Sequence, residues 1–206
     1  MNAIRTPRLM LIAATAESLS AELASPQALG EFLGCDVPAS WPPELYDADA
    51  VRWTLNWLAE HPEQAGWCLY YIVESPLAPS DRPQLVGVCG YKGGPDAAGE
   101  VEIGYGIVPE QRRRGFASEA VRGMLARAFA DPRVTKVIAH TLSELAASIG
   151  VLQATGFLFD GPGSDPQEPA AIRFVLSREI YEQGMAAHET AGALRSPSRS
   201  ARSTAT

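Results

Sequence analysis

One stretch of the chain constrains the fold more than any other: a strand-like run, a short basic turn and an amphipathic helix. The run covers residues 101–108, and the turn is Arg112-Arg113-Arg114-Gly115-Phe116-Ala117. The next apolar residues repeat with helical spacing, and Asp131-Pro132 ends the pattern before a second strand at 134–139. This order predicts a βαβ-like unit and therefore an α/β (α+β) protein. The helical stripe is Ala117, Ala120, Val121, Met124, Leu125, Ala128 and Phe129.

The basic turn has the chemistry of a phosphate site. The first N–H groups of a helix have no partner inside it, and the helix dipole places partial positive charge there. Gly115 and the small Ala117 let a ligand approach the backbone, and the three arginines attract phosphate. Neither an ATP-binding glycine loop nor a dinucleotide fingerprint occurs in the chain. The turn therefore predicts a pyrophosphate site.

These residues resemble the signature of the Gcn5-related N-acetyltransferase superfamily, Gln/Arg-x-x-Gly-x-Gly/Ala after the fourth strand. Further segments resemble its ribosomal-protein N-terminal acetyltransferase branch, and the matches run in order from about residue 5 to residue 178. They are residues 5–11 for the opening strand, 101–105 for the fourth strand, 117–120 for the third helix, and 148–152 with Gly156-Phe157 for the last helix and its turn.

The resemblance implies the fold of that superfamily, with flanking helices and a mixed, mostly antiparallel sheet of six to seven strands. The fourth and fifth strands are expected to splay apart. With 206 residues, we expect one domain at 1–182 and a low-complexity, disordered tail at 183–206. Helices are expected at 15–23 and within 26–60, and further strands at 67–73, 84–91 and 171–176.

The resemblance also implies acetyl-coenzyme A as the acyl donor. Its pantetheine arm would lie along Ile107 and Val108, after a bulge that Gly104 and Gly106 permit. A backbone N–H near Ile107 would stabilise the oxyanion. The remaining residues expected to bind the coenzyme are Arg112, Arg113, Arg114, Gly115, Phe116, Ala117 and Ser118.

Two residues are the catalytic candidates. Glu102 matches the strand-four glutamate that acts as general base in several members, although a structural carboxylate is an equal alternative and Glu100 a weaker one. Ser148 is the candidate to protonate the leaving thiolate, or else a helix serine bonded to the preceding turn. The tyrosine and asparagine common in the superfamily are replaced here by Leu152 and Leu145.

The acceptor implied by the resemblance is a primary amine, on a protein N-terminus or a small molecule. Trp41 and Tyr105 are the candidate substrate contacts, whereas Trp53 and Trp57 are expected to pack in the core or on a helix face. A non-catalytic acyl-coenzyme A binding module and an acyltransferase for longer chains stay open as alternatives. Leu145 and Leu152 are the residues that favour the binding module.

Composition excludes several other classes. A net charge of −7 disfavours nucleic acid as a partner, and no segment is long enough to span a membrane. The three separated cysteines suit a reducing compartment, which predicts a cytoplasmic protein without disulfides or a metal site. A signal peptide at the N-terminus is disfavoured because the apolar run at 9–14 is short. A homodimer is compatible with the sequence, which does not decide the oligomeric state.

Overall fold

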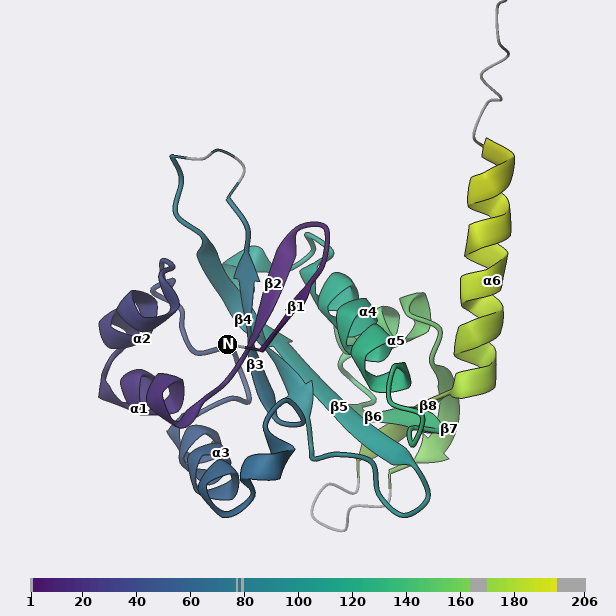
Figure 1. Ribbon diagram of the computed structural model, residues 1–206, viewed down its shortest axis with the longest axis horizontal. Coiled ribbons are helices and arrows are strands. Elements are labelled where there is room, and N and C mark those ends of the chain that lie inside the picture. Colours follow the sequence, from purple (N-terminus) through teal and green to yellow (C-terminus); the bar gives the residue numbers. More distant parts are fainter. Residues whose placement is uncertain (1, 77, 79, 164–169, 196–206) are drawn as a thin grey trace, which may run out of the picture.

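The computed structural model describes residues 2–76, 78, 80–163 and 170–195. Within them an eight-stranded sheet has the order β1-β2-β3-β4-β5-β6-β8-β7 (Figure 1). Every neighbouring pair is antiparallel except β5 and β6, which are parallel. The strands are β1 (Ala3–Arg5), β2 (Leu9–Ala13), β3 (Leu69–Glu74), β4 (Gln84–Tyr91), β5 (Glu100–Ile107), β6 (Lys136–Leu142), β7 (Leu158–Pro162) and β8 (Ala171–Ser177).

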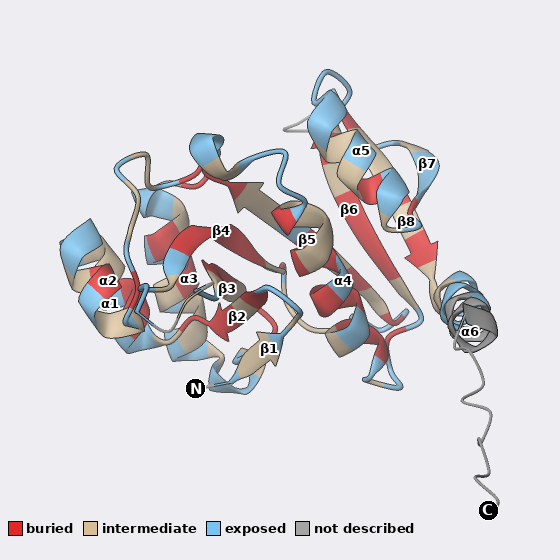
Figure 2. Cartoon of the chain, turned by 90° about the horizontal axis from the view of Figure 1, so that it is seen from above, coloured by how far each residue is buried: buried red, intermediate tan, exposed pale blue. Residues whose placement is uncertain are grey.

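Helices cover both faces of the sheet, so the protein has two hydrophobic cores (Figures 1 and 2). Alternation along the strands sends Leu11 and Ile103 to one core and Ile12 and Val88 to the other. The first core also holds α4 and α5, and the second holds α1, α2 and α3. The helices are α1 (Ala16–Ala24), α2 (Pro26–Leu33), α3 (Ala48–Glu60), α4 (Phe116–Phe129), α5 (Ala146–Ala154) and α6 (Arg178–Arg195), with short 3₁₀ turns at Pro62–Gln64 and Pro109–Gln111.

The sheet has more strands than the six to seven expected. The N-terminal segment forms a hairpin, because Ala3 pairs with Ile12 and Arg5 with Met10. The other unexpected strand, β7, pairs with β8 at the sheet edge and is mostly exposed. Its sequence ends in Asp-Gly-Pro, residues that are depleted in strands, and this explains why the pattern did not predict it.

The expected helical stretch at 26–60 consists of two helices separated by a loop. Gly34 adopts a left-handed conformation and ends α2, while the Asp47 carboxylate accepts hydrogen bonds from two N–H groups of α3 and begins that helix. The loop between them passes over β5, where a Cβ on Gly106 would lie 3.3 Å from Pro43 Cβ. This glycine therefore permits the close approach of the loop to the sheet.

The expected boundary at residue 183 between the domain and a disordered tail falls inside α6, which continues to Arg195 (Figure 1), so the disorder of the tail stays a prediction. The segment contains Ala186, Ala187, Ala191 and Ala193, and alanine is the strongest helix former. A composition that cannot build a core can still form an exposed helix, and residues 182–187 are indeed exposed. Residues 196–206 lie outside the described residues.

Candidate active site

The sheet opens between β5 and β6. These two strands pair only at Glu100↔Lys136, Val101↔Val137 and Glu102↔Ile138. Beyond that point β5 continues beside β4 as far as Ile107, and β6 continues beside β8 (Figure 2). The splay expected for the fourth and fifth strands of the superfamily is thus confirmed, with β5 and β6 in those positions.

The open side of β5 exposes backbone groups for hydrogen bonding. Lys92 N–H donates to Glu102 O, and Val108 N–H donates to Val86 O at 3.0 Å. Because backbone groups alternate in direction along an antiparallel ladder, those of Tyr105 and Ile107 point towards the opening. The Ile107 carbonyl accepts from Arg112 Nε at 3.0 Å, which leaves its N–H available.

Two details of the pantetheine prediction differ from the structure. The pairing of β4 with β5 is regular from 103 to 107, so the bulge expected at the two glycines is absent. Val108 has no backbone group to offer, since its N–H bonds Val86 and its carbonyl accepts from Gln111 N–H at 3.0 Å. Its side chain is also fully buried. Among the described backbone, Tyr105 and Ile107 are better placed for this role than Val108.

A cradle of N–H groups lies where β5 leads into α4. Among the described residues, no acceptor is present for the N–H groups of residues 113–118. Gly115 is the N-cap residue of α4 with φ 82°, and Arg113 before it also has a positive φ of 59°. Left-handed residues at a helix start turn successive N–H groups towards one point, which favours an anion. These six donors, which we call the N–H cradle, fit a pyrophosphate.

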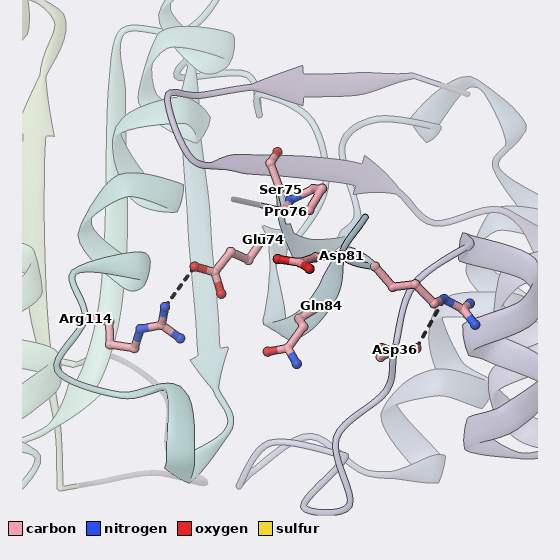
Figure 3. A pocket seen from close by; sticks show the side chains of 8 residues that line it. Asp36, Glu74, Ser75, Pro76, Asp81, Gln84 and Arg114 are labelled. Carbon is pink, nitrogen blue, oxygen red and sulfur yellow. Dashed lines mark hydrogen bonds and ion pairs between the residues drawn. The ribbon is translucent and has the colours of Figure 1, made fainter. Parts of the chain in front are cut away.

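The three arginines of the turn have different partners. Arg112 Nη2 pairs with Glu44 at 2.9 Å, and Arg114 Nη2 pairs with Glu74 at 2.9 Å. Figure 3 shows the second of these pairs. Arg113 is exposed and has no polar partner in the described part of the chain. Arg112 and Arg114 therefore hold the loop in place, and Arg113 alone is free to meet a ligand.

Phe116 contributes to the cradle only through its N–H, because its ring is buried beneath two guanidinium groups. Arg8 and Arg114 lie 4.9 Å and 4.6 Å from the ring centroid. Ala117 packs against the core behind it, while Ser118 is partly exposed beside the cradle.

Glu119 joins this helix start to the turn between β1 and β2. Its Oε1 accepts from the Thr6 hydroxyl at 2.6 Å and from Arg8 N–H at 2.7 Å, and its Oε2 accepts from Arg8 Nε at 2.7 Å. Burial opposes ionisation here, yet the Thr6 and Arg8 donors hold the pKa of Glu119 below its usual value. The resemblance had marked both segments, but no sequence signal indicated that they touch.

Glu102 is the last residue of β5 that pairs with β6, and its side chain lies on the face of the sheet towards α1–α3. Its Oε1 lies 2.5 Å from Lys92 Nζ and 3.1 Å from His140 Nδ1. Lys92 is largely exposed, whereas the side chains of Glu102 and His140 are 21% and 18% exposed. The buried Nε2 of His140 has no hydrogen-bond partner among the described residues. The sequence analysis missed His140, and only its place two residues beyond Ile138 in the parallel register could have indicated it.

Tyr105 and Ser148 meet on the opposite face of β5. The Tyr105 hydroxyl lies 3.1 Å from Ser148 O and 3.2 Å from Ser148 Oγ. Burial raises the pKa of Tyr105, with the Ser148 contact acting in the opposite direction, so the phenol keeps its proton at neutral pH. Leu152 is completely buried in the core, and Leu145 is partly exposed at the start of α5.

The indole N–H of Trp41 is already hydrogen-bonded within the protein. Its Nε1 donates to Glu22 at 3.1 Å, and Tyr46 and Tyr71 donate to the other oxygen of the same carboxylate. Burial raises the pKa of Glu22 in spite of these donors. Trp41 also packs against both tyrosine rings. This placement favours a packing role for Trp41 over the expected substrate contact.

Trp53 and Trp57 stack on one another along α3 at 5.4 Å, and Trp53 is 59% exposed. They thus pack on a helix face rather than inside a core. Among the described residues, no group of three or more possible ligands is arranged to hold a metal ion. No described helix is long and apolar enough to cross a membrane.

The site combines an opened β5–β6 pair with an adjoining N–H cradle, an arrangement that suits a ligand carrying a pyrophosphate. The family described as "Acetyltransferase (GNAT) domain" matches residues 8–158. The chain therefore belongs to the GNAT acetyltransferase family and is an acyltransferase.

Individual relatives agree with this assignment. The "Uncharacterized N-acetyltransferase YjdG" of Bacillus subtilis is 26% identical over 134 residues, which is 65% of this chain and 76% of that protein. A probable GNAT-family acetyltransferase from Chromobacterium violaceum superposes with a TM-score of 0.58 at 26% identity, covering 87% of this chain and 88% of that one.

A third comparison is structural only. RimL, a ribosomal L7/L12 alpha-N-protein acetyltransferase solved in complex with coenzyme A, gives a TM-score of 0.59 at 12% identity. It covers 87% of this chain and 99% of the RimL chain. At that identity the likeness concerns the fold.

Proposed function

We propose that this protein transfers an acetyl group from acetyl-coenzyme A to a primary amine, by direct attack in a ternary complex. The observation that carries the proposal is one row of groups: the N–H cradle, then the Ile107 N–H and the Tyr105 backbone on the open side of β5, and then the Glu102–His140 pair. A coenzyme bound by its pyrophosphate would extend its arm along the open edge of β5 towards that pair.

The proposed base is Glu102 together with His140. An α-amine with a pKa of about 8 is only roughly a tenth neutral at pH 7, so a proton acceptor accelerates the attack. Lys92 Nζ already lies 2.5 Å from Glu102, on the solvent side, which supports the carboxylate as a binding point for an ammonium group. An acceptor amine would replace Lys92 there.

The amine nitrogen attacks the thioester carbonyl carbon, and the oxyanion accepts a hydrogen bond from the Ile107 N–H. The nitrogen gives its proton to the Glu102–His140 pair, and the carbon–sulfur bond breaks. The thiolate takes a proton from the Tyr105 hydroxyl, which its contact with Ser148 orients. Tyr105 thus acts as the acid rather than as the acceptor contact expected from the sequence.

The acceptor is proposed as a protein N-terminus or a small amine. The name of RimL supports the first class, since that protein acts on an N-terminal amine. The acidic groups beside the opening, Glu102 and Glu44, suit a cationic acceptor.

The test is release of coenzyme A thiol on a panel of peptides and small amines. We expect Glu102→Gln to lower kcat by about 100-fold, in the range of a lost general base, with unchanged affinity for acetyl-coenzyme A. His140→Gln should lower kcat less, because Glu102 remains. The matched control is Glu100→Gln on the same strand, whose carboxylate is already paired with Lys136 and Arg173. Equal losses in the Glu100 and Glu102 variants would contradict the assignment of the base, and wild-type protein that turns over no amine would contradict the function.

A further inference from the structure

A depression adjoins the N–H cradle beside the β1–β2 turn. It has a volume of about 640 Å³ and lies between the β1–β2 turn and the first two turns of α4. Gly115 and Ser118 belong both to the cradle and to the lining of this depression. A ligand held at the cradle therefore reaches the depression directly.

Three arginines line the depression, and we call it the arginine pocket. Arg5 is exposed and has no polar partner among the described residues. Arg122 donates from Nη2 to the Ala154 carbonyl at 3.1 Å, and its other nitrogens have no acceptor in the described part of the chain. This concentration of positive charge occurs in a protein with a net charge of −7, so it is a local feature of this surface.

The third guanidinium, Arg8, is fixed in position. Glu119 holds its Nε, the Arg114 carbonyl holds its Nη1 at 3.0 Å, and its ring contact with Phe116 orients the plane. Its Nη2 has no acceptor among the described residues and lies 3.3 Å from the point where a Cβ on Gly115 would stand. The single carboxylate in the lining, Glu119, is fully occupied by Thr6 and Arg8 and leaves Nη2 free for a ligand.

We propose that the arginine pocket binds the 3′-phosphate of coenzyme A, so that the protein selects the phosphorylated coenzyme over its dephospho form. This inference rests on the proposed function. A pyrophosphate on the cradle has two ends, and the pantetheine end leads into the β5–β6 opening. The nucleoside end then leads towards Arg5, Arg8 and Arg122, whose guanidinium groups match a phosphate monoester with about two negative charges.

Another depression, lined in part by Arg114 of the basic turn, has the wrong charge for a 3′-phosphate. It measures about 410 Å³ and contains the carboxylates of Asp36, Glu74 and Asp81. Arg82 in its lining is paired with Asp36. Arg114 is paired with Glu74, as Figure 3 shows. The carboxylates outnumber the guanidinium groups, so this depression repels a phosphate.

The experiment is calorimetric titration of the full chain with coenzyme A and with dephospho-coenzyme A at one ionic strength. Charge-assisted hydrogen bonds to a phosphate predict that the wild-type protein binds coenzyme A about 10-fold or more tightly than the dephospho form. Arg5→Gln should weaken coenzyme A about 5-fold and leave dephospho-coenzyme A within twofold, and Arg5→Gln with Arg122→Gln should bind both alike. Arg52→Gln, on the exposed face of α3, is the control and should keep the wild-type ratio.

The outcomes separate this inference from the proposed function. Equal wild-type affinities for the two coenzymes would overturn the inference and leave acetyl transfer intact. Equal weakening of both coenzymes by Arg5→Gln would also overturn it, because the arginine would then act only through long-range attraction. If neither coenzyme binds, the proposed function itself fails.

Discussion

The N–H cradle and the proposed reaction centre are built in different ways. The N–H cradle of residues 113–118 consists of backbone donors from one continuous segment, held by Gly115 and the start of α4. The proposed reaction centre consists of side chains from three separate elements, since Glu102 and Tyr105 lie on β5, His140 on β6 and Ser148 on α5. A site made of backbone tolerates most side-chain changes but not a change of conformation, whereas a site made of side chains loses its function with a single polar atom.

The residues of the proposed reaction centre lie on both faces of β5. Charged groups, Glu102 with Lys92 and His140, lie on the face towards α1–α3, and the neutral Tyr105–Ser148 pair lies on the α4–α5 face. The two faces are available for opposite proton transfers, because strand alternation separates residue 102 from residue 105. The thioester would lie between them, at the open edge.

The largest effect is expected where the cradle is broken. Gly115 has a left-handed backbone with φ 82°, which is strained for glutamate. Gly115→Glu also places a carboxylate among the N–H donors of the cradle. We expect coenzyme A affinity to fall by at least about 100-fold in calorimetry. Arg113→Ala should cost less than about 5-fold, since backbone donors hold the ligand.

The matched control for this change is Gly34→Glu. Gly34 has φ 68° and open space around its Cβ position, but it ends α2 far along the chain from the cradle. It should reproduce the backbone strain without the loss of affinity. A cradle variant that binds coenzyme A as well as the Gly34 variant does would show that the pyrophosphate lies elsewhere.

A smaller effect is expected from Tyr105→Phe, which removes the hydroxyl and keeps the ring. A thiol with a pKa of about 8.5 is already a fair leaving group, so kcat should fall only about 10-fold, with KM for the acceptor unchanged. Steady-state kinetics separates the two parameters. A raised KM with unchanged kcat would instead restore the substrate contact that the sequence predicted. Tyr181→Phe on α6, stacked on Phe129, is the control.

The smallest effect concerns Glu119, which anchors the cradle to the β1–β2 turn. Its folded-state pKa is lowered, so its contribution to stability is present above its unfolded pKa and is lost as pH falls through the folded value. Glu119→Gln should lower the free energy of unfolding by about 1 kcal/mol at pH 7. The difference from wild type should shrink below about pH 4.5.

Denaturant unfolding of both proteins at pH 7 and pH 4 checks this prediction. Glu182→Gln, at a carboxylate that is 61% exposed on α6, should leave the stability unchanged at both values. A difference for Glu119→Gln that stays constant across the two pH values would mean that its charge is not what the Thr6 and Arg8 donors stabilise.

The sequence predicted the fold to the extent that local pattern encodes it. The β5–α4 unit, the β4 strand at 84–91 and the splay followed from alternation, helical spacing and the resemblance. β7 was missed because an exposed edge strand carries little pattern, and α6 was underestimated because alanine helices need no buried face. The hydrogen bond from Val108 N–H to Val86 O disfavours the predicted role of Val108, and this bond depends on the register of two strands.

By itself, the sequence determined where α4 begins and hence the N–H cradle, because a helix start after a glycine is a property of six consecutive residues. It also determined that Glu102 belongs to the same strand as the open edge. Only the tertiary structure decided that His140 lies 3.1 Å from Glu102, that Tyr105 turns to Ser148, and that the β1–β2 turn delivers Arg8 to the cradle. These contacts join residues 38, 43 and 106 positions apart, and such distances are fixed by strand register and helix packing rather than by local sequence.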